Sequence, residues 1–349
     1  MKLKLLFINL LLFICTININ GATNFPANDW PNSSMEKDGF GIKKINDLFT
    51  VVKEENQVKS ILIISNGNIV AEYLKSGTTK DTVFNFFSCT KSFTSALIGI
   101  AIDLGYIKSE NQLLSDYFPE IKKTPGKNQI TLHHLLSMTS GLDWPESTEW
   151  GHFFSPMIRS SNWVNFIVNR DMECQPGHNF NYNSGESHLL SAIIQKSTAK
   201  NTLDFANEHL FTKLGMNSVT WPTDPQGINF GGAWIQMTTR DAARFAYFYL
   251  NKGIWNGEQI ISESWIDKST KVQSAGYKWD DYTGGNYGYQ WWINTYRGYK
   301  TYYAWGAREQ YIFITPELNL IAIFTSSFNN GNYKRPPYLY SEYIITSFE

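Results

Sequence analysis

A serine and a lysine stand three positions apart, as Ser88 and Lys91, in the stretch "NFFSCTKSFTSALIGIAIDLG". Residues three apart share one face of a helix, so the lysine amine can reach the serine hydroxyl. The apolar residues after Lys91 recur at helical spacing and predict a desolvated amine, whose lowered pKa makes it a competent base near neutral pH. Helix N-terminal N–H groups also suit a serine that becomes alkoxide-like. The alternative is a helix cap followed by an ordinary exposed lysine.

The same spacing occurs at Ser197 and Lys200, but in a different setting. There the pair ends a predicted helix and polar residues follow, which is typical of a solvated C-terminus.

A lysine base usually works with a second proton carrier, and Tyr182 lies in a suitable loop just before an amphipathic helix. Its other interpretation is a loop tyrosine with its hydroxyl in water.

The elements around these residues change character along the chain. Residues 58–75 predict a β-hairpin around Asn66-Gly67, and a helix pattern runs over 88–104. Amphipathic helix patterns then fill 111–274, followed by a β-meander and a closing helix over about 337–348. This order predicts an α/β (α+β) fold with one antiparallel sheet assembled from both termini, flanked by helices, and a large, mostly helical inserted region.

We expect a signal peptide over residues 1–21 and one domain over 22–349. The start "MKLKLLFINLLLFICTINING" has lysines, a short apolar run and a polar exit, so the protein is expected to be secreted or periplasmic. Lipid attachment at Cys15 is not favoured, because bulky residues precede it. Within the domain, the sheet region is predicted over about 50–110 and 283–349, and the helical region over about 111–282.

Composition narrows the classes of partner. The formal net charge is −1, which does not favour nucleic acid, and after signal removal no segment predicts stable membrane insertion. Three cysteines exclude a disulfide-rich scaffold, and Cys89 and Cys174 are expected to be separate packed thiols. No spacing predicts a metal site or a Ser-His-Asp nucleophile turn. The 12 tryptophans are read mainly as core, with a carbohydrate-binding surface as the lesser alternative.

Seven segments in a fixed order carry a family resemblance. They include "FFSCTKSFTSALIGIAID", "ITLHHLLSMTSGLDW", "FNYNSGESHLLSAIIQKST" and "GAREQYIFITPELNLIAIF", and the set spans about 84 to 324. The chain resembles the serine β-lactamase and penicillin-binding-protein superfamily, and within it the class C-like esterases and 6-aminohexanoate-dimer hydrolases. The Ser-x-x-Lys motif is a known signature of that superfamily.

The resemblance implies a β-lactamase/transpeptidase-like fold and a role for each matching residue. Ser88 would be the acylated nucleophile, Lys91 its base, and Tyr182 the proton carrier to the leaving group. Ser184 would hydrogen-bond near the lysine and the substrate. The Ser88 and Ala307 N–H groups would form an oxyanion hole. The remaining residues implied at the substrate are Trp305, Gly306 and Arg308.

Departures from the family pattern bear on the substrate. Penicillin-recognising members carry Lys-Thr-Gly where this chain reads Ala304-Trp305-Gly306-Ala307, and only Arg308 could replace the missing cation. Ser184 stands where asparagine is usual, and Glu309 where glycine is common. These differences favour a hydrolase of small esters or amides that needs no cofactor. The alternatives are β-lactamase or D-Ala-D-Ala carboxypeptidase-like activity, or a non-catalytic relative that binds an acyl or peptide ligand.

A loop over 142–159 is expected to overhang the cleft. Its candidate walls are Trp144, Trp150 and Phe153. Asp143 and Glu149 could select a cationic substrate, or Asp143 and Trp144 could simply fix the turn.

Overall fold

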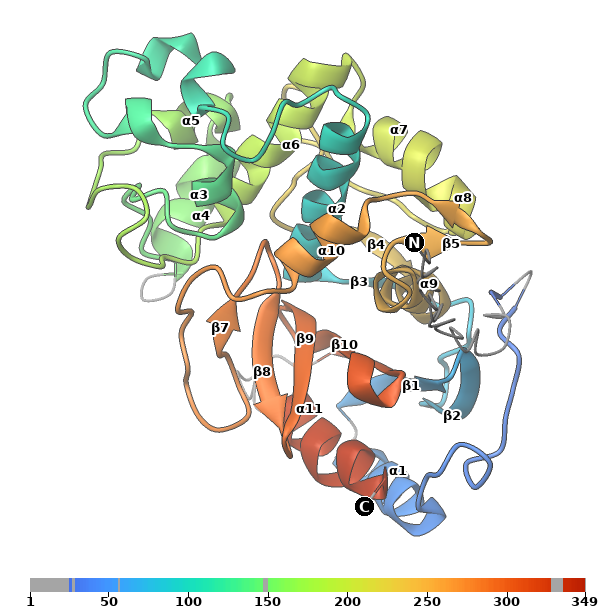
Figure 1. Cartoon of the computed structure of the whole chain (residues 1–349). Coiled ribbons are helices and arrows are strands. Elements are labelled where there is room, and N and C mark those ends of the chain that lie inside the picture. The colour runs from blue at the N-terminus through green and yellow to red at the C-terminus, as the bar shows by residue number, and fades with distance from the viewer. Residues whose placement is uncertain (1–24, 27–28, 56, 147–149, 328–334, 349) are drawn as a thin grey trace, which may run out of the picture.

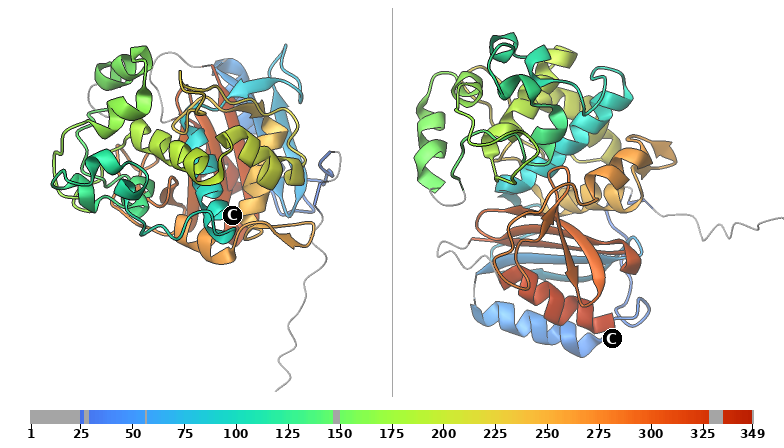
Figure 2. Two further views of the ribbon diagram at one scale, coloured as in Figure 1. Left: turned by 90° about the horizontal axis from the view of Figure 1, so that it is seen from above. Right: turned by 60° about the vertical axis from the view of Figure 1, so that its left-hand side comes forward.

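The computed structural model describes residues 25–26, 29–55, 57–146, 150–327 and 335–348. A central sheet has helices on both faces (Figures 1 and 2). Helix α1 and the C-terminal helices cover one face, as the right-hand view of Figure 2 shows, and the helical region lies beyond the other. None of the helices in these ranges combines the length and hydropathy needed to cross a membrane.

The main sheet has seven strands in the order β2-β1-β11-β10-β9-β8-β7, and every neighbouring pair is antiparallel. Strands β1 and β2 come from the start of the chain and the others from its end, as the sequence predicted. The bounds are β1 Val58–Ser65, β2 Asn68–Leu74, β7 Asn286–Tyr287, β8 Trp292–Tyr296, β9 Tyr299–Gly306, β10 Gln310–Thr315 and β11 Leu320–Ser326. Two short strands, β3 (Val83–Asn85) and β4 (Gln236–Thr238), pair separately, as do β5 (Ile254–Trp255) and β6 (Glu258–Gln259).

Both faces of the sheet are buried, which explains the nearly continuous apolar runs of its central strands. On β1, Leu62 and Ile64 belong to the core beneath the helical region, whereas Ile61 and Ile63 belong to the core beneath α1 and the C-terminal helices. Register is set at the first turn, where Asn66 and Gly67 have φ of 49° and 77°. That geometry is the one that makes Asn-Gly a strong hairpin signal.

The predicted helices are present, together with others that the sequence patterns did not predict. Helix α1 (Ile42–Glu55) was not predicted, and it packs Ile45, Leu48 and Val52 against the sheet. Besides α1, the longer helices are α2 (Thr90–Asp103), α4 (Trp150–Arg159), α6 (Ser184–Thr198) and α9 (Thr239–Leu250). The shorter ones are α3 (Leu132–Leu136), α5 (Trp163–Val168), α7 (Thr202–Ala206), α8 (Thr212–Leu214), α10 (Glu263–Ser269) and α11 (Arg335–Leu339). Single turns complete them: η1 (Phe87–Cys89), η2 (Leu114–Asp116), η3 (Pro119–Ile121), η4 (Lys127–Gln129), η5 (Asn207–Phe211), η6 (Pro316–Leu318), η7 (Tyr340–Ile344) and η8 (Ile345–Phe348).

Helix α2 runs through the middle of the molecule and is buried almost all round. Its Phe93 ring stacks on Phe245 of α9 at 3.7 Å between centroids. At Gly99, α2 approaches α10 so closely that a Cβ would lie 2.5 Å from the Trp265 indole. Trp265 is itself buried, so it has little room to move away.

Replacing Gly99 with alanine should therefore lower the free energy of unfolding by about 1–3 kcal/mol, because overpacking outweighs alanine's better helix propensity. Urea denaturation would measure the change. Gly41→Ala is the matched control, since a Cβ there lies no closer than 3.4 Å to another atom. Equal stability of Gly99→Ala and the unsubstituted protein would contradict the packing argument.

Candidate active site

Ser88 lies in the single turn η1, which leads directly into α2. The preceding residue, Phe87, has a left-handed φ of 44°, and its N–H donates to Asn85 Oδ1 at 2.8 Å. The Thr90 hydroxyl donates to the Phe87 carbonyl at 2.5 Å and accepts from the Ile235 N–H at 3.1 Å. Ser88 is therefore held on a sharp, braced turn, and its side chain is only half-buried.

Lys91 is 1% exposed, and its amine has three oxygen neighbours. Its Nζ lies 3.2 Å from Ser88 Oγ, 2.9 Å from Ser184 Oγ and 2.7 Å from the Gly232 carbonyl. Burial lowers the pKa of Lys91 to about 8, although the carboxylate of Glu146 opposes the shift. An appreciable fraction of the amine is therefore neutral near pH 8.

Tyr182 and Ser184 flank the start of α6, where Asn183 caps the helix by accepting from the Glu186 N–H at 3.0 Å. Lys91 Nζ lies 4.7 Å from the centroid of the Tyr182 ring. Burial, followed by the charge of Glu146, raises the pKa of the Tyr182 phenol, and an interaction with Ser88 opposes this. The Tyr182 hydroxyl therefore keeps its proton at neutral pH. Ser184 is 1% exposed, so its hydroxyl faces Lys91 inside the protein wall.

Glu146 belongs to the site, although the sequence analysis did not select it. It accepts hydrogen bonds from the Ser184 hydroxyl, the Ser184 N–H and Trp144 Nε1, each at 2.7 Å. Trp144 was expected to be a cleft wall, and this is wrong: its side chain is completely buried. The only local sign was an indole donor two residues before an acid in "LDWPE".

The β9–β10 turn brings the predicted oxyanion residues to the nucleophile. A Cβ at Gly306 would lie 2.2 Å from the Phe86 carbonyl oxygen and 3.2 Å from the Ser88 nitrogen. Only glycine permits this approach, and Ala307 follows immediately. The guanidinium of Arg308 is 5.4 Å from the centre of the Phe87 ring, and its side chain is exposed.

Glu309 is fully buried rather than lining a cleft. Burial raises its pKa to about 8, and Glu55 and Arg335 are the charged residues that act on it. These two residues belong to α1 and α11, on the side of the sheet away from the helical region.

Three tryptophans form an aromatic wall next to Tyr182: Trp279, Trp292 and Trp305. Their ring centroids are 5.3–5.7 Å apart, and Trp292 stacks on Tyr182 at 5.8 Å. Trp279 is 48% exposed, so part of the wall is open to solvent. Trp305 directly precedes Gly306, which places the wall beside the residues predicted to form the oxyanion hole.

Other expectations for the 142–159 segment have mixed outcomes. Residues 150–159 form helix α4 rather than a loop. Asp143 is paired with Arg170 at 2.5 Å, in keeping with a turn-fixing role. Glu149 and the side chains of Trp150 and Phe153 lie outside the described residues, as do the predicted signal peptide and Cys15. Cys89 and Cys174 are free thiols, as expected.

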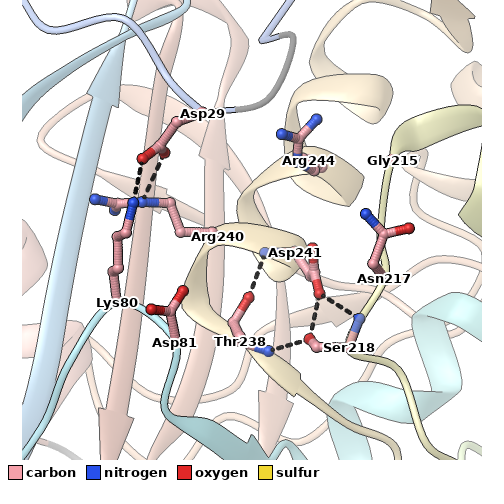
Figure 3. A pocket seen from close by; sticks show the side chains of 10 residues that line it. All are labelled: Asp29, Lys80, Asp81, Gly215, Asn217, Ser218, Thr238, Arg240, Asp241 and Arg244. Atoms are coloured by element: carbon pink, nitrogen blue, oxygen red, sulfur yellow. Dashed lines mark hydrogen bonds and ion pairs between the residues drawn. The ribbon is translucent and has the colours of Figure 1, made fainter.

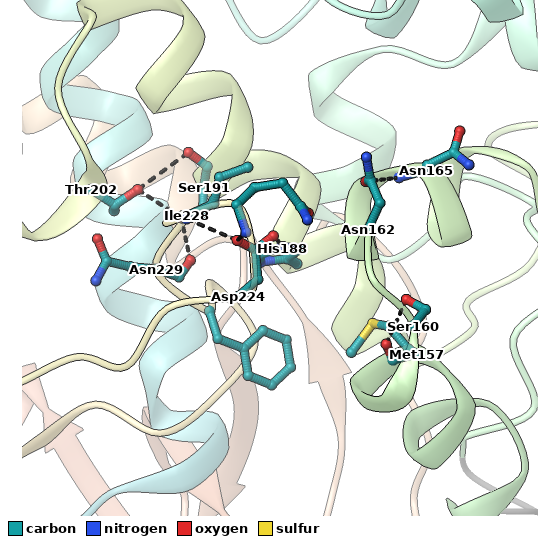
Figure 4. A network of polar contacts seen from close by, with 12 residues as sticks. Met157, Ser160, Asn162, Asn165, His188, Ser191, Thr202, Asp224, Ile228 and Asn229 are labelled. Atoms are coloured by element: carbon teal, nitrogen blue, oxygen red, sulfur yellow. Dashed lines mark hydrogen bonds and ion pairs between the residues drawn. The ribbon is translucent and has the colours of Figure 1, made fainter.

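Two further polar groups lie apart from Ser88 and Lys91. A pocket of about 250 Å³ is lined by charged residues that mostly pair with one another, such as Lys80 with Asp29 at 2.8 Å (Figure 3). In the network of Figure 4, His188 Nε2 lies 3.0 Å from Asp224 Oδ2, and both side chains are completely buried. This His–Asp pair cannot meet a substrate. Among the described residues, no group of three or more potential ligands could hold a metal ion.

Comparison with known proteins agrees with this geometry. Residues 53–340 match the Beta-lactamase family. The chain belongs to that family. It is 23% identical over 257 residues to the 6-aminohexanoate-dimer hydrolase of Paenarthrobacter ureafaciens, covering 68% of this chain and 65% of that protein. The chain thus spans less than two thirds of the length of this curated relative.

Solved structures show the same β-lactamase/transpeptidase-like fold. A Bacillus anthracis protein provisionally named a 6-aminohexanoate-dimer hydrolase superposes with a TM-score of 0.75 at 23% identity, covering 94% of this chain and 90% of that one. The D-amino acid amidase of Ochrobactrum anthropi superposes with a TM-score of 0.67 at 17% identity, covering 88% and 97%. Membership of the family supports a hydrolase.

The buried Lys91 predicts a specific pH dependence of stability. Its folded pKa of about 8 is below the ordinary value of 10.5, so the unfolded chain binds more protons between these values and stability rises with pH across that window. The cost of burying the charged form, on the order of 2–3 kcal/mol, is present at pH 7 and largely gone by pH 10.

Lys91→Met removes this titration, so its unfolding free energy relative to the unsubstituted protein should fall by that amount between pH 7 and pH 10. Urea denaturation of both proteins at the two pH values would measure it. Lys200→Met, at an exposed lysine paired with Glu208, is the control and should show no such change. A pH-independent difference for Lys91→Met would mean that Lys91 is not desolvated.

Proposed function

We propose that this protein is a serine hydrolase that cleaves small esters or amides through an acyl-enzyme on Ser88, with Lys91 and Tyr182 as its acid–base pair. The observation that carries the proposal is the buried Lys91 amine, with its pKa lowered to about 8, at 3.2 Å from Ser88 Oγ. A general base is most effective when its pKa lies near the working pH and its reach is a hydrogen bond.

In the proposed acylation step, neutral Lys91 takes the Ser88 proton as Oγ attacks the substrate carbonyl carbon. The N–H groups of Ser88 and Ala307 stabilise the resulting oxyanion. Tyr182, whose raised pKa keeps it protonated, gives its proton to the leaving alcohol or amine and regains one from the Lys91 ammonium. The bond to the leaving group breaks, and the acyl group remains on Ser88.

Deacylation reverses the proton path. Water attacks the acyl carbon, and its proton passes through Tyr182 and Lys91 to Ser88 Oγ as the acid leaves. The reaction is acyl transfer to water in two half-steps and needs no cofactor.

Three considerations support an ester or amide substrate over a β-lactam. The place of the family's Lys-Thr-Gly holds Trp305-Gly306-Ala307, which supplies an aromatic surface instead of a cation. Two of the similar proteins are named as a 6-aminohexanoate-dimer hydrolase and an amidase. The aromatic wall offers an apolar surface beside Tyr182, which suits a substrate with an aliphatic or aromatic part. We also propose that the protein is exported, on the basis of residues 1–21 alone.

A burst assay with p-nitrophenyl butyrate would test the nucleophile. The unsubstituted protein should release p-nitrophenol in a burst and gain the mass of one butyryl group on the peptide that contains Ser88. Ser88→Ala should lose both, and its turnover should fall roughly a thousandfold or more.

Ser197→Ala is the matched control, because it removes the serine of the other Ser-x-x-Lys match and should leave the burst unchanged. Nitrocefin in parallel separates the alternatives: faster turnover of nitrocefin than of the ester would favour a β-lactamase. Absence of both burst and adduct would favour a ligand-binding relative and refute the proposed hydrolase.

Truncating the exposed tryptophan of the wall should change substrate selection. Trp279→Ala is expected to raise KM for p-nitrophenyl esters with long acyl chains by about five- to tenfold, with kcat little changed, because apolar contact area is lost. Steady-state kinetics on acetate through octanoate esters would measure the dependence on chain length. Tyr106→Ala, at another exposed aromatic residue, should leave it unaltered. An unchanged chain-length profile in Trp279→Ala would exclude the wall as an acyl-binding surface.

A further inference from the structure

Glu146 stands behind Ser184 in the wall of the site, and among the described residues its carboxylate has three hydrogen-bond donors. Oε1 accepts from the Ser184 hydroxyl, and Oε2 accepts from the Ser184 N–H and from Trp144 Nε1. The residue is 7% exposed. A carboxylate so enclosed does not present an oxygen to the substrate, so any effect on the reaction must pass through its neighbours.

The hydrogen-bond directions around Lys91 follow from this contact. A serine hydroxyl has one proton, and an ionised carboxylate can only accept, so the Ser184 proton points to Glu146. Ser184 Oγ must then accept from Lys91, at 2.9 Å. The Gly232 carbonyl, at 2.7 Å, can also only accept. A neutral amine has two N–H bonds and one lone pair, so the lone pair is left for Ser88.

We infer that Glu146 is a positioning residue for the acyl transfer: by orienting the Ser184 hydroxyl, it aims the lone pair of Lys91 at the Ser88 proton. This inference rests on the proposed function. Without Glu146 the Ser184 proton would be free to turn towards Lys91 and occupy the lone pair that Ser88 requires.

The charge of Glu146 also acts on the two proposed proton carriers, Lys91 and Tyr182. The titratable groups that face Lys91 are Glu146, Cys89 and Tyr182. Burial lowers the pKa of Lys91, and Glu146 is the largest influence that raises it. Glu146 also raises the pKa of Tyr182. One carboxylate therefore keeps the lysine basic enough to take a proton and keeps the tyrosine protonated.

Glu146→Gln tests the inference with little change of shape. Two N–H donors converge on the Oε2 position, so the amide oxygen should settle there and its NH2 should face Ser184 Oγ. Ser184 then accepts from glutamine and donates to Lys91. The plateau rate of Ser88 butyrylation should fall about ten- to a hundredfold with little change in KM, and the midpoint of its pH profile should move to lower pH.

A double-mutant cycle with Ser184→Ala tests whether Glu146 acts on Lys91 through the Ser184 hydroxyl. In the Ser184→Ala background, Glu146→Gln should not lower the plateau further, whereas the shift of the midpoint should persist. Equal losses of plateau rate in both backgrounds would overturn the route through Ser184. If Glu146→Gln does not fold, an unchanged plateau in Ser184→Ala alone would overturn it.

Failure of the inference can be told apart from failure of the proposed function. If the unsubstituted protein is acylated on Ser88 but Glu146→Gln matches it in plateau and midpoint, only the inference fails. An NMR titration of 13C-labelled lysine follows Lys91 even without turnover. A Lys91 midpoint that is the same in Glu146→Gln as in the unsubstituted protein would overturn the electrostatic role of Glu146.

Discussion

The burial of one lysine amine is the constraint on which the site depends. Taking an ammonium group out of water is costly unless its donors are matched, and Lys91 finds acceptors on three separate segments. Ser88 comes from the turn before α2, Ser184 from the first residue of α6, and Gly232 from a loop. That loop packs so tightly on α6 that a Cβ at Gly231 would lie 2.1 Å from the Ser187 carbonyl oxygen. The contacts that satisfy the amine thus also fix the distance between the two helices that carry the proposed chemistry.

Opposite pKa shifts assign the proposed roles. Burial acts on both Lys91 and Tyr182, but it disfavours the charged form of each, so the lysine loses its proton more easily and the tyrosine less easily. The two groups lie in contact, with the amine over the phenol ring. The proposed base and the proposed acid therefore hold suitable protonation states at the same pH without a histidine. The buried His188–Asp224 pair is a structural contact inside the helical region.

The sequence predicted the parts of the molecule that local pattern determines. The hairpin at Asn66-Gly67, the helix after Ser88 and the origin of the sheet in both termini are confirmed, and Lys91 is buried as its apolar neighbours indicated. Contacts between distant segments could not be predicted. Glu146 was missed because an acid in a polar loop usually faces water, and only the folded chain places it against Ser184. Of the two interpretations of Trp144, the cleft wall is wrong, because the folded chain buries its ring and directs its indole N–H to Glu146. Helix α1 was overlooked because its lysine-rich sequence has only a narrow apolar stripe.

The strand order has a consequence for biosynthesis. Strand β1 lies between β2 and β11, so its second neighbour is the last strand of the chain. While the ribosome is still making the middle of the protein, the edge of β1 that pairs with β11 has no partner strand, and β9, which carries Gly306, does not yet exist. Long-range pairing of this kind folds slowly compared with local structure. The nascent chain therefore contains Ser88, the proposed nucleophile, before the strand that carries Gly306 has been made.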